Sequence, residues 1–493
     1  MSFPPFGWVA ICAGASLACS FASGPQPGSP NDAAPAEGGR ASDASFRSCT
    51  IALPAALGWT LSASGTSFRD ASGRIVFLRG VAAGGRSKFA PYVPFDFDTA
   101  QYGTALGAYM DRAASWGINV LRVPFTWAAL EPTMGQDDAN WLSLYDQLLD
   151  AAWARGMYTI LDFHQDVYSE VYCGDGFPGW TVSKPPAPHH DCPSWSGKYT
   201  TDSDVRSAFD RFWAAGSPVQ AEYLAAWDVM LARYKDRPGV IGFEPINEPG
   251  WGTANLETFS ATTLTAFYSM MVAHMRAAAP QSLVFVDTDG FDGLSLSTML
   301  GRPSGDGVVF APHFYPSNHD PNAVEAGLKT WADIGASWNV PVFVGEFGLN
   351  DTSSMAVPFI SANFDAFDAL GLSGSEWEYS VSSAVWNSET FSLVAADGSE
   401  NPIAQAILRP FARAVAGTSV EQAFDASSST FSLSYIAGGG VTEVSLPPRA
   451  YPSGYELTLT GACADTASTP GRLFLQSDMD GGTSSVALRI APK

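Results

Sequence analysis

Basic residues are scarce in this chain. Lys and Arg together number 26, against 49 Asp and Glu, so the formal net charge is −23 at pH 7. A surface with this charge repels the phosphates of nucleic acids and gains no electrostatic attraction to anionic membranes. The composition therefore argues against a nucleic-acid partner. Hydrophobic residues make up 46% of the chain, which is enough to form a sizeable core. A length of 493 residues suggests one large and one small domain.

Histidine and cysteine are also rare, with 6 residues of each, and they form no cluster at the spacing of metal ligands. We therefore expect neither a metal ion nor another cofactor. Four cysteines remain if the N-terminal segment is removed, and an even number suits an oxidising compartment. Cys173 and Cys192 lie in one loop-like stretch and form the preferred disulfide, with Cys49–Cys463 as a further candidate pair.

The apolar segment at the start of the chain is too short to be expected to span a membrane. Residues 1–23 are apolar and then rich in small residues, which indicates a signal peptide although the usual positive first region is missing. A lipoprotein signal, with the lipid attached at Cys19, is the alternative. Residues 24–50 are rich in Pro, Gly, Ala and Ser and predict a disordered linker. We expect a secreted or extracytoplasmic protein, either free or anchored at Cys19.

Strand-like and helix-like segments alternate from residue 65 to a last expected helix at 402–415. Eight apolar runs rich in Val, Ile and Phe fit a parallel sheet that is buried on both faces. This pattern predicts a (β/α)8 TIM barrel, which we place at residues 51–416. A doubly wound sheet is the alternative, but no glycine-rich phosphate turn follows the first strand. Residues 417–493 alternate apolar and polar side chains between turns, which predicts an antiparallel β-sandwich domain.

Polar and aromatic side chains follow the predicted strands at their C-terminal ends, where TIM-barrel enzymes carry their active sites. Two of them are glutamates, Glu248 after the fourth strand and Glu346 after the seventh, on opposite sides of the barrel. A carboxylate at the end of an apolar strand is costly unless it is used. Such a pair can flank a glycosidic bond, while strand-end caps or ion pairs are the alternative. The other polar and aromatic residues at strand ends are Arg122, His164, Asp166, Asn247, His313, Tyr315 and Trp377.

Short motifs at these strand ends resemble glycoside hydrolase family 5, which belongs to the retaining clan A. They are "NEP" at the fourth strand, "GEFG" at the seventh, "LRVPFTW" around Arg122 and "DFHQD" around His164. The resemblance covers about residues 65–415. It implies that Glu248 is the general acid/base and that Glu346 is the nucleophile of a two-step displacement.

The two glutamates then need opposite ionisation states. A nucleophile must stay ionised, and we expect Arg122 to lower the pKa of Glu346 while Tyr315 donates a hydrogen bond to it. An acid catalyst must first hold a proton, so the surroundings of Glu248 should raise its pKa.

The stretch "LDFHQDVYSE" resembles, within this family, the endoglycoceramidase branch, whose enzymes cut the bond between a glycan and ceramide and also carry a C-terminal β-sandwich. In that branch a lysine after the first strand and the aspartate of "HQD" contact the first sugar, and Lys88 and Asp166 match them. By the same resemblance, Asn247 would hold the sugar 2-hydroxyl and Trp377 would support the sugar face. The long aromatic stretch 171–202 is expected to build the glycan or lipid side of the cleft.

The resemblance implies a retaining hydrolase that cleaves the β-glycosidic bond between a glycan and a lipid. Its partners would be a glycolipid or oligosaccharide substrate and, transiently, a lipid surface, and we expect a monomer. Three alternatives remain: a family 5 endoglucanase or mannanase, a β-glucosidase acting on glucosylceramide or sterol glucoside, and a sugar-binding lectin on an inactive barrel. A broad apolar shelf beside the cleft would favour a lipid, and a long groove of surface tryptophans would favour a polymer.

Overall fold

The computed structural model describes the chain except residues 1–45, 52–57, 183–190, 193, 351 and 479–483. Contacts divide the chain into Met1–Glu37 and Gly38–Lys493. The first unit, with the predicted signal peptide and Cys19, lies outside the described residues, as does most of the predicted linker. Among the helices of the described part, none combines the length and apolar composition that a membrane crossing requires.

Eight parallel strands form the central sheet, in the order β10-β9-β8-β7-β6-β5-β12-β11. A bridge between Phe310 and Val342 joins the two ends of this order, so that the sheet closes into a barrel. The longer strands are buried along their whole length, as expected for apolar runs covered on both faces. The predicted TIM barrel is confirmed. Its strands are β5 Arg79–Ala82, β6 Val120–Phe125, β7 Tyr158–Phe163, β8 Val240–Glu244, β9 Leu283–Val286, β10 Val308–Phe310, β11 Phe343–Val344 and β12 Ser373–Glu376.

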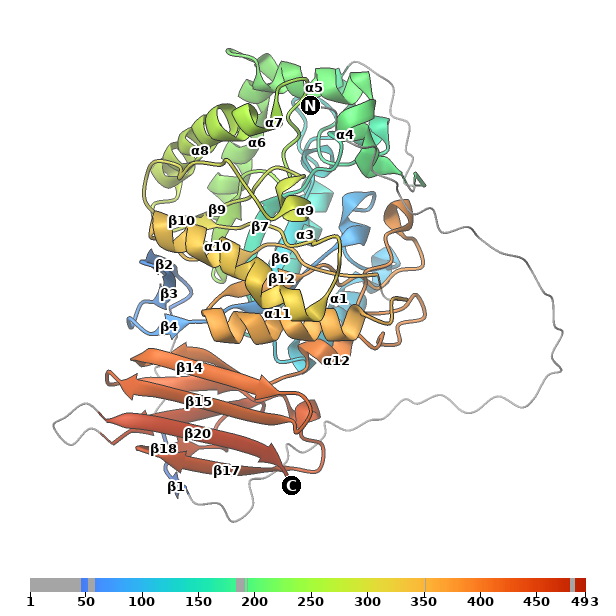
Figure 1. Ribbon diagram of the computed structural model, residues 1–493. Coiled ribbons are helices and arrows are strands. Elements are labelled where there is room, and N and C mark those ends of the chain that lie inside the picture. The colour runs from blue at the N-terminus through green and yellow to red at the C-terminus, as the bar shows by residue number, and fades with distance from the viewer. Residues whose placement is uncertain (1–45, 52–57, 183–190, 193, 351, 479–483) are drawn as a thin grey trace, which may run out of the picture. The chain divides into compact units, whose positions relative to one another are not determined.

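Helices lie around the outside of the barrel (Figure 1). Their starts follow from local side chains: Asp138 caps α3 by accepting from two backbone N–H groups, and Ser217 caps α6 just before Pro218. The expected helix at 402–415 is confirmed only in its first part, because Pro410 lacks the N–H that a helix needs and the chain beyond it is a strand. The longer helices are α1 Tyr102–Ser115, α3 Ala139–Trp153, α5 Ser203–Trp213, α6 Pro218–Tyr234, α8 Thr265–Ala278, α10 Val324–Trp338 and α11 Ala356–Leu370. A four-residue helix, α12, covers Ala404–Ile407.

The C-terminal strands form two sheets, as predicted. An eight-stranded sheet has the order β1-β18-β19-β16-β13-β4-β3-β2, and a four-stranded sheet has the order β14-β15-β20-β17. Apolar side chains of both sheets share one core. Both ends of the segment predicted as barrel contribute strands to the larger sheet, since β13 pairs antiparallel with β4 and β16. The strands of the larger sheet are β1 Arg47–Ser48, β2 Leu61–Ser64, β3 Ser67–Asp70, β4 Ile75–Val76, β13 Phe411–Val415, β16 Val441–Ser445, β18 Ala462–Asp465 and β19 Arg472–Ser477. Those of the smaller sheet are β14 Gly417–Asp425, β15 Thr430–Ala437, β17 Tyr455–Thr460 and β20 Ser485–Pro492.

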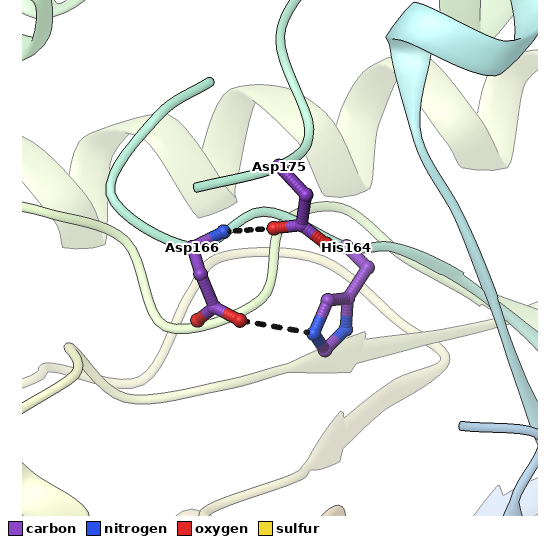
Figure 2. A group of neighbouring side chains, drawn as sticks. All are labelled: His164, Asp166 and Asp175. Atoms are coloured by element: carbon purple, nitrogen blue, oxygen red, sulfur yellow. Dashed lines mark hydrogen bonds and ion pairs between the residues drawn. The ribbon is translucent and has the colours of Figure 1, made fainter. Parts of the chain in front are cut away.

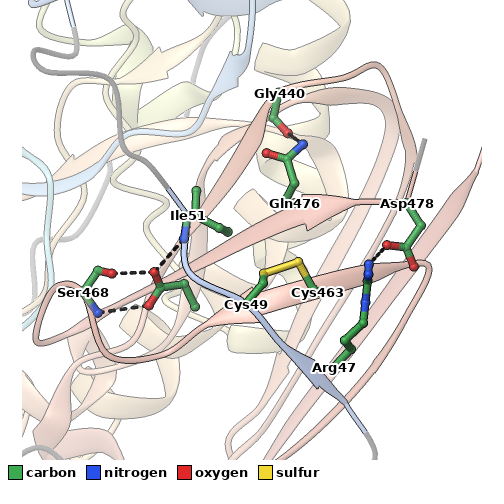
Figure 3. The surroundings of a disulfide bond; sticks show 9 residues. Arg47, Cys49, Ile51, Gly440, Cys463, Ser468, Gln476 and Asp478 are labelled. Atoms are coloured by element: carbon green, nitrogen blue, oxygen red, sulfur yellow. Dashed lines mark hydrogen bonds and ion pairs between the residues drawn. A yellow bond between two sulfur atoms is a disulfide. The ribbon is translucent and has the colours of Figure 1, made fainter. Parts of the chain in front are cut away.

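Both candidate disulfides are present. Cys173 and Cys192 are bonded in the stretch after β7, and Cys49 is bonded to Cys463 in β18. Beside the second bond, β1 pairs parallel with β18, and the backbone N–H of Ile51 donates to a carboxylate oxygen of Asp465 at 3.0 Å (Figure 3). This disulfide therefore fastens the start of the described chain to the C-terminal sheet.

Candidate active site

Every site residue predicted from the sequence except Arg122 lies at the C-terminal end of a barrel strand or in the loop that follows it, whereas Arg122 lies within β6. Their contacts form two neighbouring groups, one around the paired glutamates and one around a buried lysine. In chain order they are Lys88 after β5, Arg122 in β6, His164 and Asp166 after β7, Asn247 and Glu248 after β8, His313 and Tyr315 after β10, Glu346 after β11, and Trp377 after β12.

Arg122 organises the first group. It is fully buried, and its Nε and Nη2 donate to the two carboxylate oxygens of Glu244 at 2.7 and 2.8 Å. Its Nη1 donates to Oε1 of Glu346 at 2.6 Å, and Nη2 also donates to Oδ1 of Asn247 at 2.8 Å. Asp162 lies 3.0 Å from the same Nη2. A planar guanidinium with paired carboxylates is a rigid support, so Arg122 holds Glu346 and Asn247 in place.

Glu346 is held at both oxygens. Arg122 donates to Oε1, and the hydroxyl of Tyr315 donates to Oε2 at 2.9 Å. Burial opposes ionisation of this carboxyl, but the positive charges of His313 and Arg122 outweigh burial and lower its pKa. The expected contacts of Arg122 and Tyr315 with Glu346 are therefore present in the structure.

Glu248 has different surroundings. Its side chain is 18% exposed, compared with 6% for Glu346, and its Oε1 lies 2.8 Å from Nδ1 of His313. Burial and the nearby charge of Glu346 raise its pKa, although His313 opposes them. The two glutamates thus have pKa values displaced in opposite directions. A carboxylate oxygen of each lies within 4.8 Å of the other.

The backbone at Glu248 is strained and supported. Its φ is 38°, in the left-handed region, which costs a non-glycine residue on the order of 1–3 kcal/mol. Its N–H donates to Asp287 at 2.9 Å, and Nε2 of Gln165 donates to its carbonyl oxygen at 2.9 Å. These two side chains fix the direction in which the carboxylate points.

His313 connects the two glutamates. It is buried, and its Nδ1 lies 2.8 Å from Glu248 and 3.6 Å from Glu346, while Nε2 lies 3.3 Å from Asp287. Burial alone would lower its pKa, but Asp287 and Glu346 raise it to about 10. The ring is therefore cationic at neutral pH and contributes to the low pKa of Glu346.

The second group surrounds Lys88. The ammonium donates to Oδ2 of Asp166 at 2.6 Å, and Nε2 of His164 lies 3.6 Å from the same oxygen. Asp175 accepts from the backbone N–H of Asp166, as Figure 2 shows. Trp377 stacks on His164 with ring centres 5.1 Å apart. The predicted Lys88, Asp166, His164 and Trp377 are therefore in one cluster beside the glutamates.

Several supporting residues were missed by the sequence analysis. Glu244 ends β8, three residues before "NEP", Asp162 lies in β7 as the first residue of "DFHQD", and Asp287 follows β9. The signal that identified the two paired glutamates, a carboxylate within or beside an apolar strand, applies to all three. Gln165 lies in the "HQD" motif itself.

Among the residues that the structure describes, three sets of side chains bring ligand-type atoms within 4.8 Å of one another. In each set, however, an acid already accepts from a fixed cation: Asp166 from Lys88, and Glu244 and Glu346 from Arg122. These sets are hydrogen-bond networks in which a lysine or arginine supplies the positive charge, and the expectation of no metal stays a prediction. The sets are His164, Asp166 and Asp175; Glu244, Asp287 and His313; and Glu248, His313 and Glu346.

Comparisons with known proteins agree with this geometry. The family model described as cellulase (glycosyl hydrolase family 5) matches residues 88–388, and a model of the family 5 C-terminal domain matches 409–490. Endoglycoceramidase I of Rhodococcus hoagii is 27% identical over 454 residues, which cover 86% of each chain. Endoglucanase CelA of Streptomyces lividans is 26% identical over 337 residues, 66% of this chain and 57% of that one. Endo-glycoceramidase II from Rhodococcus sp., solved as a lactosyl-enzyme intermediate, matches with a TM-score of 0.71 at 25% identity, covering 86% of this chain and 99% of that one.

Proposed function

Because this chain belongs to glycoside hydrolase family 5, we propose that it hydrolyses the β-glycosidic bond between a glycan and a lipid aglycone with retained anomeric configuration. The observation that carries this proposal is the pair Glu248 and Glu346, with carboxylate oxygens within 4.8 Å and pKa values shifted in opposite directions. Retaining hydrolysis uses carboxyl groups about 5–5.5 Å apart, and inverting hydrolysis uses about 6.5–9.5 Å. The short separation supports the retaining route.

In the proposed first step, the ionised Glu346 attacks the anomeric carbon and forms a covalent glycosyl ester. Glu248 gives its proton to the leaving oxygen, which departs as the neutral alcohol of the lipid. In the second step Glu248, now ionised, takes a proton from water, and the oxygen of that water displaces Glu346. The lactosyl-enzyme intermediate of the solved relative supports such an ester. When the ester breaks, Glu346 becomes negatively charged again. The hydrogen bonds that Arg122 and Tyr315 donate to its two oxygens would stabilise this charge.

An apolar rim beside Glu248 supports the lipid aglycone. Gly290 approaches so closely that an added Cβ would lie 3.4 Å from the Cβ of Glu248. In the chain that follows, Phe291 is 48% exposed, Leu294 46% and Met299 56%. Because Glu248 is proposed to protonate the leaving group, apolar side chains in the segment that follows Gly290 are suited to contact the aglycone. Among the large apolar side chains exposed in the described residues there is no tryptophan, which favours a lipid over a polymer.

Replacing Phe291 and Leu294 together with serine is expected to raise KM for a ganglioside about tenfold or more, because apolar burial contributes roughly 25 cal/mol per Å². KM for an aryl lactoside, which lacks the lipid, should stay within about twofold. Ile436→Ser removes a similarly exposed side chain from β15 of the C-terminal sheets and serves as the control. An equal increase of KM for both substrates would contradict the assignment of this rim to the aglycone.

The opposite pKa shifts predict a bell-shaped dependence of kcat/KM on pH. Activity should fall below the lowered pKa of Glu346, where the nucleophile gains a proton, and above the raised pKa of Glu248, where the proton donor is lost. The alkaline limb should disappear in Glu248→Ala when an activated aryl glycoside is the substrate. If that limb keeps its midpoint in the variant, another group supplies the proton.

The proposed substrate class is tested by incubating the protein with a ganglioside, glucosylceramide, a sterol glucoside and carboxymethyl cellulose. Intact oligosaccharide and ceramide from the ganglioside are the expected products. Turnover restricted to glucosylceramide or sterol glucoside would favour a β-glucosidase, and turnover restricted to the polymer an endoglucanase. The monomeric state and extracytoplasmic location remain part of the proposal, and the two disulfides suit an oxidising compartment.

A further inference from the structure

The loop after β12 brings a further carboxylate, Glu389, to the lysine of the sugar site. Its Oε2 lies 3.1 Å from Nζ of Lys88, which also donates to Asp166. The side chain of Glu389 is 15% exposed, whereas those of Lys88 and Asp166 are 3% exposed. Glu389 is thus the member of this trio that is most open to a molecule in the cleft.

Aromatic rings fix the lysine between these acids. Nζ of Lys88 lies 4.0 Å from the ring centre of Trp386, 4.6 Å from that of Trp377 and 5.6 Å from that of Trp195. Cation–π contacts with desolvated ammonium groups stabilise such an arrangement. Because Lys88 cannot easily move, the carboxylate of Glu389 that pairs with it has a defined position as well.

Asn387 fastens this loop to both halves of a disulfide. Its Nδ2 donates to the carbonyl oxygen of Cys173 at 2.7 Å, and its Oδ1 accepts from the backbone N–H of Cys192 at 2.9 Å. Cys173 and Cys192 are bonded to each other. The φ values of Asn387 and Ser388 are 46° and 65°, a left-handed pair that needs external support. The amide of Asn387 supplies this support two residues before Glu389.

We propose that Glu389 is a specificity-determining residue that accepts a hydrogen bond from a glycone hydroxyl, and that Asn387 is the residue that positions it. The proposal rests on the glycosidase function proposed above. Within the described part of the chain, Lys88 contacts Oε2 of Glu389 and no hydrogen bond reaches Oε1, which leaves this oxygen for a ligand. A carboxylate beside a fixed ammonium forms strong hydrogen bonds with hydroxyl donors.

The electrostatics of the loop agree with this role. Burial raises the pKa of Glu389 to about 7, and the negative charges of Asp166 and Glu346 add to this effect although Lys88 opposes it. The ionised carboxylate is therefore poorly compensated in the free protein. A sugar hydroxyl that donates to it would supply the missing stabilisation.

The test measures kcat/KM for each combination of a Glu389 variant and a monodeoxy substrate, as in a double-mutant cycle. The substrates are 2,4-dinitrophenyl β-glycosides, in the shortest form that the wild type turns over, and their 3-, 4- and 6-deoxy analogues in the glycone. Removing the one hydroxyl that Glu389 binds should lower wild-type kcat/KM about 10- to 100-fold. Glu389→Ala should lower kcat/KM for the parent glycoside by a similar factor and should then be insensitive to that deoxy position. Glu389→Gln, which keeps a neutral acceptor oxygen, should be intermediate.

Two outcomes would overturn the proposal. The first is that removing a given hydroxyl lowers kcat/KM by the same factor in wild type, Glu389→Ala and Glu389→Gln. In that case Glu389 binds none of the tested hydroxyls, while the proposed glycosidase function stands. If Glu389→Ala fails to fold, the comparison of wild type with Glu389→Gln decides in the same way. If the wild type turns over none of the glycosides, the proposed function and this inference both fail.

The positioning role of Asn387 has its own readout. Asn387→Ala should raise KM for the parent glycoside about 3- to 10-fold and leave kcat within about twofold. The combined Cys173→Ala and Cys192→Ala variant should raise KM similarly, and adding Asn387→Ala to it should cause little further change, because both release the same loop. Fully multiplicative effects on KM, or an equal loss of kcat, would contradict this role.

Discussion

Replacing Glu346 with glutamine is expected to lower kcat at least a thousandfold on both a ganglioside and an activated aryl glycoside. This factor corresponds to about 4 kcal/mol of activation free energy. The amide has nearly the same size, so the contacts of Arg122 and Tyr315 keep a partner, but it cannot form the glycosyl ester. The loss should be the same for good and poor leaving groups, because both need the nucleophile.

Glu376→Gln is a matched control, because Glu376 ends β12, the barrel strand that follows β11 in the chain. Glu376 is completely buried, and its carboxyl oxygens find no hydrogen-bond partner among the described residues. Burial and Glu378 raise its pKa well above the usual range, which favours the uncharged carboxyl form that glutamine resembles. Glu376→Gln should therefore keep kcat within a few-fold of wild type. Residual activity of Glu346→Gln above one thousandth, in protein free of wild type, would refute the nucleophile assignment.

Replacing Glu248 with alanine should give a loss that depends on the leaving group. A ceramide hydroxyl is a poor leaving group without a proton, and general acid catalysis contributes about 10²- to 10⁴-fold, so turnover of ganglioside should fall by that range. A dinitrophenolate leaves without help, so the single-turnover rate of glycosyl-enzyme formation should stay within about tenfold. The steady state should then be limited by the second step, in which the base is missing.

Azide provides the check on Glu248. A small anion needs no general base, so it should accelerate the second step of Glu248→Ala and give a β-glycosyl azide. Equal single-turnover losses on ganglioside and dinitrophenyl glycoside would argue that Glu248 is not the proton donor. If azide neither gives a β-glycosyl azide nor accelerates turnover by Glu248→Ala, Glu248 is not the general base of the second step.

The residues that the sequence predicted best are those fixed by local pattern. Glu248 and Glu346 follow apolar strands, and the C-terminal ends of parallel strands meet at one face of the barrel, so their proximity follows from the fold alone. Arg122 is found by the same rule. Their catalytic roles, in contrast, rest on the resemblance and on chemistry and remain to be measured.

What the sequence did not reveal depends on contacts between distant segments. Glu389 lies 301 residues from Lys88 along the chain, in a loop without a periodic pattern, so nothing local marks it as part of the site. The hairpin of β3 and β4 belongs to the C-terminal sheet because β4 pairs with β13, and local alternation does not specify this pairing. The helix predicted at 402–415 is limited to α12, because Pro410 disfavours a helical conformation of the residue before it.

We propose that this protein releases an intact glycan from a lipid by two displacements at one carbon. The most direct measurement is proton NMR during the first minutes of ganglioside hydrolysis, before the anomers of the product equilibrate, with mass spectrometry of the lipid fraction. With retention of configuration, the intact oligosaccharide is expected to appear first as its β anomer, and free ceramide should accumulate in equal amount. An oligosaccharide that appears first as the α anomer, or single sugars released while the ceramide stays glycosylated, would contradict the proposal.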